Sequence, residues 1–404
     1  MKKGWQTKPL GELCEFQRGL TYSKGDEVDV SDNVVLRATN IDLTTNLLSF
    51  DELKYINDKV VVPDSKKVKK CSLMICTASG SKSHLGKVAY IDDDYGYAFG
   101  GFMGMITPKN GLWPKYLFHL MTSDAYKDFI GELSDGVNIN NLKFDDLRTF
   151  QVPYPPPAEQ QRIVGLLDEA FEGLATAKAN AEKNLRNARA LFESHLQSVF
   201  TQRGKGWVDI ALGDVCGFVR GPFGGSLKKS IFVADGYAVY EQQHAIYDQF
   251  DDVRYFIDEA KFDEMKRFEL LPNDLIMSCS GTMGRVAIVP KGIKRGIINQ
   301  ALLKLTPSAQ ISNGFLKSWM ESEAFQDALK EYSGGAAIQN VASVKILKEI
   351  KVPLPPVEEQ ERVVDELDSL REETQRLATI YERKRDALGT LKKSLLHEAF
   401  TGQL

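Results

Sequence analysis

Two long stretches of the chain carry apolar residues at steps of three and four positions, one after residue 157 and one after residue 357. The apolar positions are Ile163, Leu167, Ala170, Leu174, Ala177 and Ala181 in the first stretch and Val363, Leu367, Leu370 and Leu377 in the second, where Thr374 is an exception. These steps are those of a coiled-coil heptad. The pattern predicts two helices that end near Phe200 and Phe400, each of roughly 40 residues and about 60 Å.

A helix of this length cannot bury its apolar seam alone. The simplest partner is the other helix of the same chain, in an antiparallel pair that holds two domains apart at its opposite ends. Two alternatives are open at this stage: each helix folds back on its own domain, or the seam pairs with a second chain. Both stretches follow a run of prolines, which disfavour helix before them, and both start with glutamates, which stabilise a helix N-terminus.

Short β-rich runs come before each helix. They are VVLRATNI, SLMICTA and KVAYI in the first half and DLIMSC and RVAIV in the second, with glycine-rich turns and short helical patterns between them. This mixture predicts an α+β domain over residues 1–152 and another over residues 206–352. The segments 153–205 and 353–404 then each contain a proline box and a long helix.

The second half of the chain repeats the first at an offset near 200 residues. Leu10, Gly11, Cys14, Arg18 and Gly19 recur as Leu212, Gly213, Cys216, Arg220 and Gly221. The box PYPPPAEQQRIV at 153–164 recurs as PLPPVEEQERVV at 353–364, and two further segments match in the same order. Four ordered matches indicate duplication of a domain together with its helix. We therefore expect two equivalent recognition domains, joined by an antiparallel coiled coil with pseudo-twofold symmetry.

Composition excludes several classes of protein. A formal net charge of −4 argues against a protein that holds nucleic acid by bulk electrostatics alone. The five cysteines form no C-x-x-C pair and the five histidines never stand four residues apart, so no metal site is predicted. No apolar stretch reaches the length of a membrane span, and the start MKKGWQTKPLGEL lacks the apolar core of a secretion signal. We therefore expect a cytoplasmic protein.

No catalytic residue stands out. The segment GSKSHLGK resembles a phosphate-binding loop, but five residues separate Gly80 from Gly86 where the nucleotide motif has four, and Val88 follows the lysine. The chain contains no G-x-G-x-x-G fingerprint, no G-x-S-x-G nucleophile elbow and no Asn/Asp-Pro-Pro-aromatic tetrad of amino-methylating enzymes. These observations favour a chain that binds rather than reacts.

Two equivalent loops combine arginine, glycine, an aromatic residue and lysine, a mixture that suits contact with a DNA backbone. Their candidate DNA-binding residues are Arg18, Tyr22 and Lys24 in the first domain and Arg220, Phe223 and Lys228 in the second. The competing interpretation is a plain glycine turn after a strand.

A second pair of loops, 79–89 and 280–287, places small polar and basic residues between strands, where backbone N–H groups can bind phosphate. Their candidate DNA-binding residues are Ser81, Lys82, His84 and Lys87 in the first loop and Thr282 and Arg285 in the second. A plain hairpin turn is the alternative.

Amide-bearing residues are further candidates, because a carboxamide can bond adenine N6 and N7 together. They are Asn138 and Asn140 in the first domain and Gln339 and Asn340 in the second, with Gln242, Gln243 and His244 as another polar cluster. Helix capping or turn formation explains these side chains as well. The two domains differ between their shared segments, as RATNIDL against VYEQQHA shows. A shared fold with unshared polar loops indicates two different targets.

The two proline boxes, the closing sequence LLHEAFTGQL and the duplicated plan of domain and helix resemble the specificity subunit of type I restriction-modification systems. The resemblance covers essentially the whole chain and departs at Pro157, where the second box has Val357. It implies a sequence-specific DNA-binding subunit with no catalytic centre of its own. Two target-recognition domains would each recognise one half of a split DNA site.

The resemblance also implies partners: double-stranded DNA, two methyltransferase (modification) subunits, and restriction subunits that translocate and cleave DNA. The long helices would set the distance between half-sites and dock the methyltransferase subunits. The expected partner-binding residues at the helix starts are Glu159, Gln160, Arg162, Glu359, Gln360 and Arg362. No cofactor is expected on this chain, since S-adenosylmethionine, ATP and Mg would be bound by the partner subunits.

Two interpretations of other classes stay open. A coiled-coil scaffold protein could use its two domains to bind protein partners, and it would show no preference among DNA sequences. A self-sufficient enzyme with an unrecognised site would turn over DNA without partners.

Overall fold

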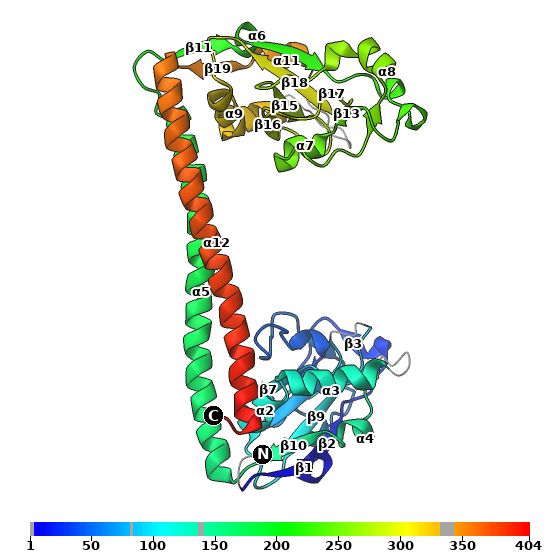
Figure 1. Ribbon diagram of the computed structural model, residues 1–404. Coiled ribbons are helices and arrows are strands. Elements are labelled where there is room, and N and C mark those ends of the chain that lie inside the picture. Colours follow the sequence, from blue (N-terminus) through cyan, green and yellow to red (C-terminus); the bar gives the residue numbers. More distant parts are fainter. Residues whose placement is uncertain (1–3, 81–83, 136–140, 332–342) are drawn as a thin grey trace. The chain divides into compact units, whose positions relative to one another are not determined.

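The computed structural model describes residues 4–80, 84–135, 141–331 and 343–404. The chain divides into two compact units, Met1–Glu182 with Arg383–Leu404, and Lys183–Glu382. We call the globular parts of these units the first and the second domain (Figure 1). Within the part of the chain that the structure describes, no helix is both long enough and apolar enough to cross a membrane.

The first domain is built from two four-stranded sheets and one two-stranded ribbon. The first sheet is antiparallel, in the order β2 (Cys14–Arg18), β9 (Met103–Pro108), β6 (Ser72–Cys76), β7 (Val88–Ile91). The second has the order β3 (Glu27–Val28), β5 (Lys54–Ile56), β4 (Asn33–Leu36), β8 (Ala98–Phe99), and its β4 and β8 are parallel. The ribbon pairs β1 (Gln6–Pro9) with β10 (Gln151–Tyr154).

Strand β6 separates two hydrophobic cores of the first domain. All five of its residues are buried, and successive side chains of a strand point to opposite faces. Leu73 and Ile75 therefore face a core shared with helices, whereas Met74 and Cys76 face a core shared with the second sheet. The helices of this domain are α1 (Leu10–Leu13), α2 (Pro114–Leu120), α3 (Asp124–Asp135) and α4 (Phe144–Leu147).

The second domain repeats this plan. Its antiparallel sheet has the order β12 (Cys216–Arg220), β18 (Leu302–Pro307), β15 (Leu275–Ser278), β16 (Val286–Ile288). A smaller sheet has the order β14 (Phe256–Ile257), β13 (Tyr237–Tyr240), β17 (Gly296–Ile298), with β13 and β17 parallel, and β11 (Val208–Ala211) pairs with β19 (Lys351–Leu354). The helices are α6 (Leu212–Val215), α7 (Gln242–Tyr247), α8 (Glu259–Glu264), α9 (Asn313–Glu321), α10 (Glu323–Glu331) and α11 (Val344–Glu349). The α+β class and the duplication are confirmed.

Two 45-residue helices, α5 (Pro157–Thr201) and α12 (Val357–Thr401), follow the proline boxes. In the first unit, Leu396 and Phe400 near the end of α12 share a core with Ile163 near the start of α5. In the second unit, Leu196 near the end of α5 shares a core with Val363 near the start of α12. Each helix start therefore lies beside the end of the other helix, and the antiparallel intrachain pair is confirmed (Figure 1).

The seam differs from the expected pattern in two respects. The first turns of each helix also pack into the core of the domain that precedes the helix. For these turns, the alternative that each helix packs on its own domain is therefore correct. Thr374 is not an exception to the seam, because it is only 6% exposed. Its hydroxyl donates to the Leu370 carbonyl at 2.8 Å, which satisfies the polar group within its own helix.

Candidate functional site

A pocket opens in the first domain where four loops meet. It lies between the loop after β2, the turn after β4, the residues after β6 and the turn between β8 and β9. The side chains that give it chemical character are Tyr22, Lys24, Arg37, Thr39, Ser79 and Phe102. The pocket thus gathers two cations, hydroxyl groups and two aromatic rings, groups that bind both phosphates and bases of nucleic acids. One carboxylate, Glu27, lines it as well.

The turn after β4 is held rigidly by Asn40. The backbone N–H of Arg37 donates to Asn40 Oδ1 at 2.8 Å, and Asn40 Nδ2 donates to the carbonyls of Ser49 at 2.9 Å and Glu52 at 3.0 Å. Asn40 is 1% exposed, so its hydrogen bonds are protected from water. This buried amide fixes the backbone from which Arg37 and the exposed Thr39 project.

A glycine lets the loop after β2 approach the pocket closely. A Cβ on Gly19 would lie 1.9 Å from the carbonyl oxygen of Gly100, a distance that no side chain tolerates. In the second domain a Cβ on Gly221 would lie 1.9 Å from the carbonyl oxygen of Asn299. The repeated Arg-Gly pair therefore marks the same close crossing of two backbones in both domains.

The turn after β13 is the counterpart of the turn after β4. The N–H of Gly100 donates to the Leu36 carbonyl at 2.9 Å in the first domain, and the N–H of Asn299 donates to the Tyr240 carbonyl at 2.9 Å in the second. The next residue in the second domain is Glu241, whose N–H donates to His244 Nδ1 at 2.9 Å. Asn40 lies three residues after Arg37, and His244 lies three residues after Glu241. His244 therefore takes the place of Asn40 as the side chain that closes the turn.

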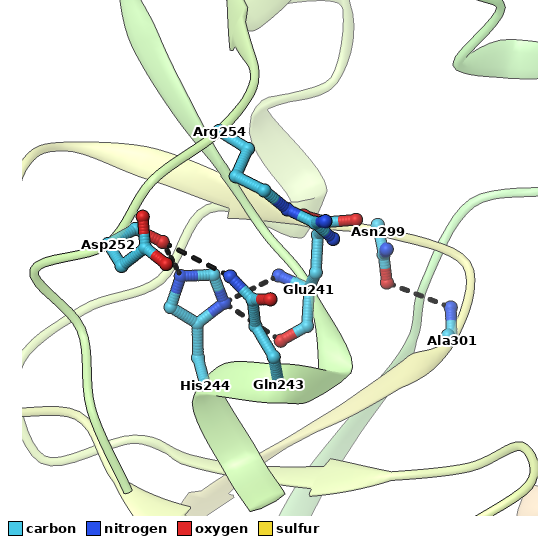
Figure 2. Close-up of polar contacts among 7 residues, drawn as sticks. All are labelled: Glu241, Gln243, His244, Asp252, Arg254, Asn299 and Ala301. Carbon is cyan, nitrogen blue, oxygen red and sulfur yellow. Dashed lines mark hydrogen bonds and ion pairs between the residues drawn. The ribbon is translucent and has the colours of Figure 1, made fainter. Parts of the chain in front are cut away.

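His244 is a structural residue, which corrects its prediction as a DNA contact. It is 1% exposed, and its Nε2 lies 3.0 Å from the carbonyl oxygen of Asp252 (Figure 2). Its Nδ1 lies 2.9 Å from both the backbone nitrogen and the carbonyl oxygen of Glu241. Both ring nitrogens are therefore occupied inside the domain.

Different polar side chains surround the second turn. Arg254 Nε donates to Glu241 Oε2 at 3.0 Å, and Arg254 Nη2 lies 2.9 Å from the same oxygen (Figure 2). Gln243 Nε2 donates to the Asp252 carbonyl at 3.2 Å, and Asn299 Oδ1 accepts from the Ala301 N–H at 2.9 Å. The first turn thus presents an arginine where the second presents a glutamate that is already paired with an arginine.

Each domain also exposes a phenylalanine near its turn. Phe102 is 74% exposed, although its carbonyl is fixed by the N–H groups of Thr77 at 2.9 Å and Ala78 at 3.1 Å. Phe223, in the loop after β12, is 92% exposed.

Both halves of the chain match one family model. Residues 2–184 and 204–382 each match the model described as the type I restriction modification DNA specificity domain. The chain belongs to this family. Membership makes it a specificity subunit rather than a catalytic one, and the duplicated domains described above are the two copies of the family's domain.

Named relatives of the specificity family match along the whole chain. The type I restriction enzyme EcoKI specificity subunit of Escherichia coli strain K12 is 25% identical over 429 residues, which cover 100% of this chain and 90% of that protein. The type I restriction enzyme StySPI specificity subunit of Salmonella potsdam is 25% identical over 433 residues, with the same coverage of 100% and 90%.

Solved structures show the same fold. A chain from a study of complex assembly and conformational transition of the type I R-M system has a TM-score of 0.81 at 20% identity, covering 100% of this chain and 99% of that one. The HsdS subunit from Thermoanaerobacter tengcongensis has a TM-score of 0.66 at 20% identity, covering 100% and 98%.

Several residues predicted for DNA binding lie at or near the turns of this specificity subunit. Tyr22 and Lys24 line the pocket of the first domain, and Arg18 is exposed, its guanidinium 5.4 Å from the centre of the Phe144 ring. Phe223, Lys228, Thr282 and Arg285 are exposed, and Gln242, Gln243 and Arg220 are half-buried. Ser81, Lys82, Asn138, Asn140, Gln339 and Asn340 lie outside the described residues.

Lys87 does not reach the surface, and its prediction as a phosphate contact is corrected. The side chain is 8% exposed, and its Nζ donates to the Ile41 carbonyl at 3.0 Å and lies 3.1 Å from Nδ1 of the half-buried His84. Burial lowers the pKa of Lys87 below its ordinary value. The lysine therefore supports the interior of the domain.

Gln160 and Gln360 were expected to bind partner subunits, and both are instead 0% exposed. Gln160 accepts from the Trp113 N–H at 2.8 Å and donates to the carbonyls of Gly111 at 3.0 Å and Pro155 at 2.8 Å. Gln360 makes the equivalent three bonds in the second unit. These glutamines attach each helix to its own domain.

The charged residues of the helix starts remain at the surface. Glu159 and Arg162 form an ion pair at 2.7 Å, and Glu359 and Arg362 form the equivalent pair at 2.6 Å. The two helices thus present the same charged first turn. These four residues stay predicted contacts for partner subunits.

The sequence interpretation missed Arg37, Thr39, Phe102, Arg254 and Asn299. One available signal was the contrast of RATN with EQQH at equivalent positions, since both segments follow a strand and open a turn. Arg254 carried no such signal, because only the fold brings it to Glu241.

Proposed function

We propose that this chain is the DNA-recognition subunit of a type I restriction-modification complex, in which each domain recognises one half of a bipartite DNA site. The observation that carries the proposal is the pair of equivalent turns, where one backbone presents Arg37 and Thr39 in the first domain and Glu241 and Gln243 in the second. Two copies of one scaffold with different polar groups can recognise two different sequences, since bases are distinguished by their donors and acceptors.

Charge supports a role inside a larger complex. With a formal net charge of −4, the chain has no general attraction for phosphate. In the proposal, two methyltransferase subunits and the restriction subunits supply much of the electrostatic attraction to DNA. The matched relatives are named as specificity subunits of type I restriction enzymes, which supports such an assembly.

The remaining parts of the proposal follow from the helices. The exposed pairs of Glu159 with Arg162 and Glu359 with Arg362 are the proposed docking points for the methyltransferase subunits. S-adenosylmethionine, ATP and Mg would bind to the partner subunits, and the complex would act in the cytoplasm on the host's own DNA. In this scheme α5 and α12 set the spacing between the two half-sites.

Domain exchange tests the proposal. Residues 206–352 are replaced by the equivalent segment of another specificity subunit, the complex is reconstituted with its methyltransferase subunits, and methylated adenines are mapped across genomic DNA. One half of the methylated site should change and the other half should stay the same. Exchange of residues 1–152 is the matched control and should change the opposite half.

The same experiment can contradict the proposal. If either exchange changed both halves of the site, or neither, the assignment of one half-site to each domain would be wrong. If the reconstituted complex bound a specific duplex no better than random duplex, a scaffold that binds proteins through its two domains would explain the chain instead.

A further inference from the structure

Arg37 lines the first pocket, and its side chain has no partner among the residues that the structure describes. Among the described residues it forms no ion pair, and its Nε is buried with no hydrogen-bond partner. The neighbouring carboxylate, Glu27, is paired with Lys54 at 2.6 Å. Burial and Glu27 raise the pKa of Tyr22 and Arg37 acts to lower it, which places the guanidinium within electrostatic reach of that hydroxyl.

The backbone of Arg37 is also held in place. The N–H of Arg37 donates to the buried Asn40, the half-buried side chain holds Nε away from solvent, and among the described residues neither Nη1 nor Nη2 forms a hydrogen bond. A guanidinium is planar and presents its donors in a set geometry, so it favours a planar partner with two acceptors. The exposed Lys24, by contrast, has the mobile point charge that suits a phosphate.

The second domain has a different residue at the position of Arg37. Glu241 replaces Arg37, and its carboxylate already accepts two contacts from Arg254, at 3.0 and 2.9 Å (Figure 2). The second turn therefore presents a neutralised pair where the first presents a net positive charge. Since the hydrogen bonds that shape the two turns are equivalent, this difference lies in the side chains and not in the scaffold.

We propose that Arg37 is the specificity-determining residue of the first domain and that it recognises a guanine in the major groove. This inference rests on the proposed function. Guanine presents two acceptors, O6 and N7, that match the two Nη groups of an arginine, whereas adenine presents one acceptor and one donor. The half-site of the first domain should therefore contain a fixed G·C pair, contacted by Arg37 at the pocket that Tyr22, Thr39 and Phe102 also line.

The experiment uses the full chain in its reconstituted complex with methyltransferase subunits. Methylation is measured over a library of sites in which each position of the bipartite sequence is varied. Arg37→Gln should relax the preference for guanine at one position of the half-site assigned to the first domain, by about tenfold to a hundredfold. Arg37→Lys keeps the positive charge but loses the two parallel donors of the guanidinium. It should weaken the preference for guanine at the same position to a smaller extent.

Arg148→Gln is the matched control. Arg148 is an exposed arginine of the same domain, paired with Asp145 at 2.8 Å and stacked at 5.2 Å from the Phe16 ring centre, and it is not among the pocket residues. Its loss removes the same charge and should leave the preferred sequence unchanged. Equal thermal midpoints of the Arg37 variants and the wild type would show that the domain remains folded.

Three results would overturn the inference. A first half-site without any fixed G·C pair would remove the base that Arg37 is proposed to contact. A loss of methylation by Arg37→Gln that is uniform over all sequences would make Arg37 a phosphate contact. An unchanged preference would exclude it from recognition altogether. In each case domain exchange would still alter one half-site, so failure of this inference is distinguishable from failure of the proposed function.

Discussion

Gln160, on the first turn of α5, accepts a hydrogen bond at 2.8 Å from the backbone N–H of Trp113, the residue that precedes α2. Gln360 does the same for the N–H of Ser312, which caps α9, also at 2.8 Å. In both units a buried carboxamide thus joins the start of the long helix to the start of a domain helix. This joint fixes the direction in which each long helix leaves its domain.

Replacement of the joint should destabilise the first domain. Gln160→Ala leaves one N–H and two carbonyl groups unsatisfied, and buried polar groups without partners cost about 1–3 kcal/mol each, so we expect a loss of at least about 3 kcal/mol. Hydrogen exchange of the α2 amides measures the free energy of opening. Gln151→Ala removes an exposed glutamine whose amide donates to Thr149 and should change the value by less than about 0.5 kcal/mol. Similar effects of the two variants would show that the carboxamide contributes no more than a surface contact.

Gly19 and Gly221 should not tolerate any side chain. A Cβ at either position would lie 1.9 Å from a backbone carbonyl oxygen, so the loop would have to move away from the backbone that it crosses. We expect Gly19→Ala and Gly221→Ala each to destabilise its own domain by about 2 kcal/mol or more, measured by hydrogen exchange of the adjoining strands.

Gly165→Ala is the control for the glycine variants. Gly165 lies inside α5, where a Cβ would meet no atom within 4 Å. Alanine should stabilise the helix there by about 0.5–1 kcal/mol. If Gly19→Ala behaved like this control, the close crossing of the two backbones would not constrain the loop.

The first domain should lose stability in mild acid through His119. Burial lowers the pKa of His119 from its ordinary value of 6.5, even though the nearby Asp168 acts to raise it. The unfolded chain takes up a proton near pH 6.5, whereas the folded domain does so only at lower pH, so stability falls as the pH drops through this window. Hydrogen exchange of α2 between pH 7 and pH 5 should show the decline.

A neutral substitution isolates the histidine in that experiment. His119→Gln cannot titrate, so the decline between pH 6.5 and pH 5 should become shallower in the first domain. The second domain has Ser318 at the corresponding position of α9, and its own decline should be unaffected by the variant. An unchanged slope in the first domain would assign the pH dependence to other groups.

Helix length should control the spacing of the two half-sites. Seven residues inserted both between 182 and 183 and between 382 and 383 add about two turns to α5 and α12, or roughly 10 Å, and keep the phase of the heptad. At about 3.4 Å per base pair, the methylated site should lengthen by about three base pairs between its halves.

A shorter insertion that breaks the heptad phase is the control for the helix-length prediction. Four residues inserted near Ala177 in α5 alone shift the seam out of phase and should alter the tolerated spacer or abolish binding. Mapping of methylated adenines measures both variants. An unchanged spacer after both insertions would mean that the helices do not set the distance.

The amino-acid sequence by itself determined the duplicated plan, favoured the antiparallel helix pair over two alternatives, and carried the resemblance to the family. These properties follow from local sequence patterns. A heptad repeat and a repeated Arg-Gly pair at Gly19 and Gly221 can be recognised without knowledge of any long-range contact. The polar candidates were a harder problem. A basic or amide residue between two strands has the same local pattern whether its side chain faces water or the interior.

Only the tertiary structure decided which polar side chains are available to a ligand. Lys87 and His244 looked like surface residues but bond to carbonyls of Ile41 and Asp252, which lie 46 and 8 residues away along the chain. Arg37 and Arg254 are chemically alike, yet the fold brings a carboxylate to Arg254, whereas Arg37 has no ion pair within the described part of the chain. Burial and pairing depend on distant segments meeting in space, and for that reason local sequence could place the two domains but not identify the side chains that contact DNA.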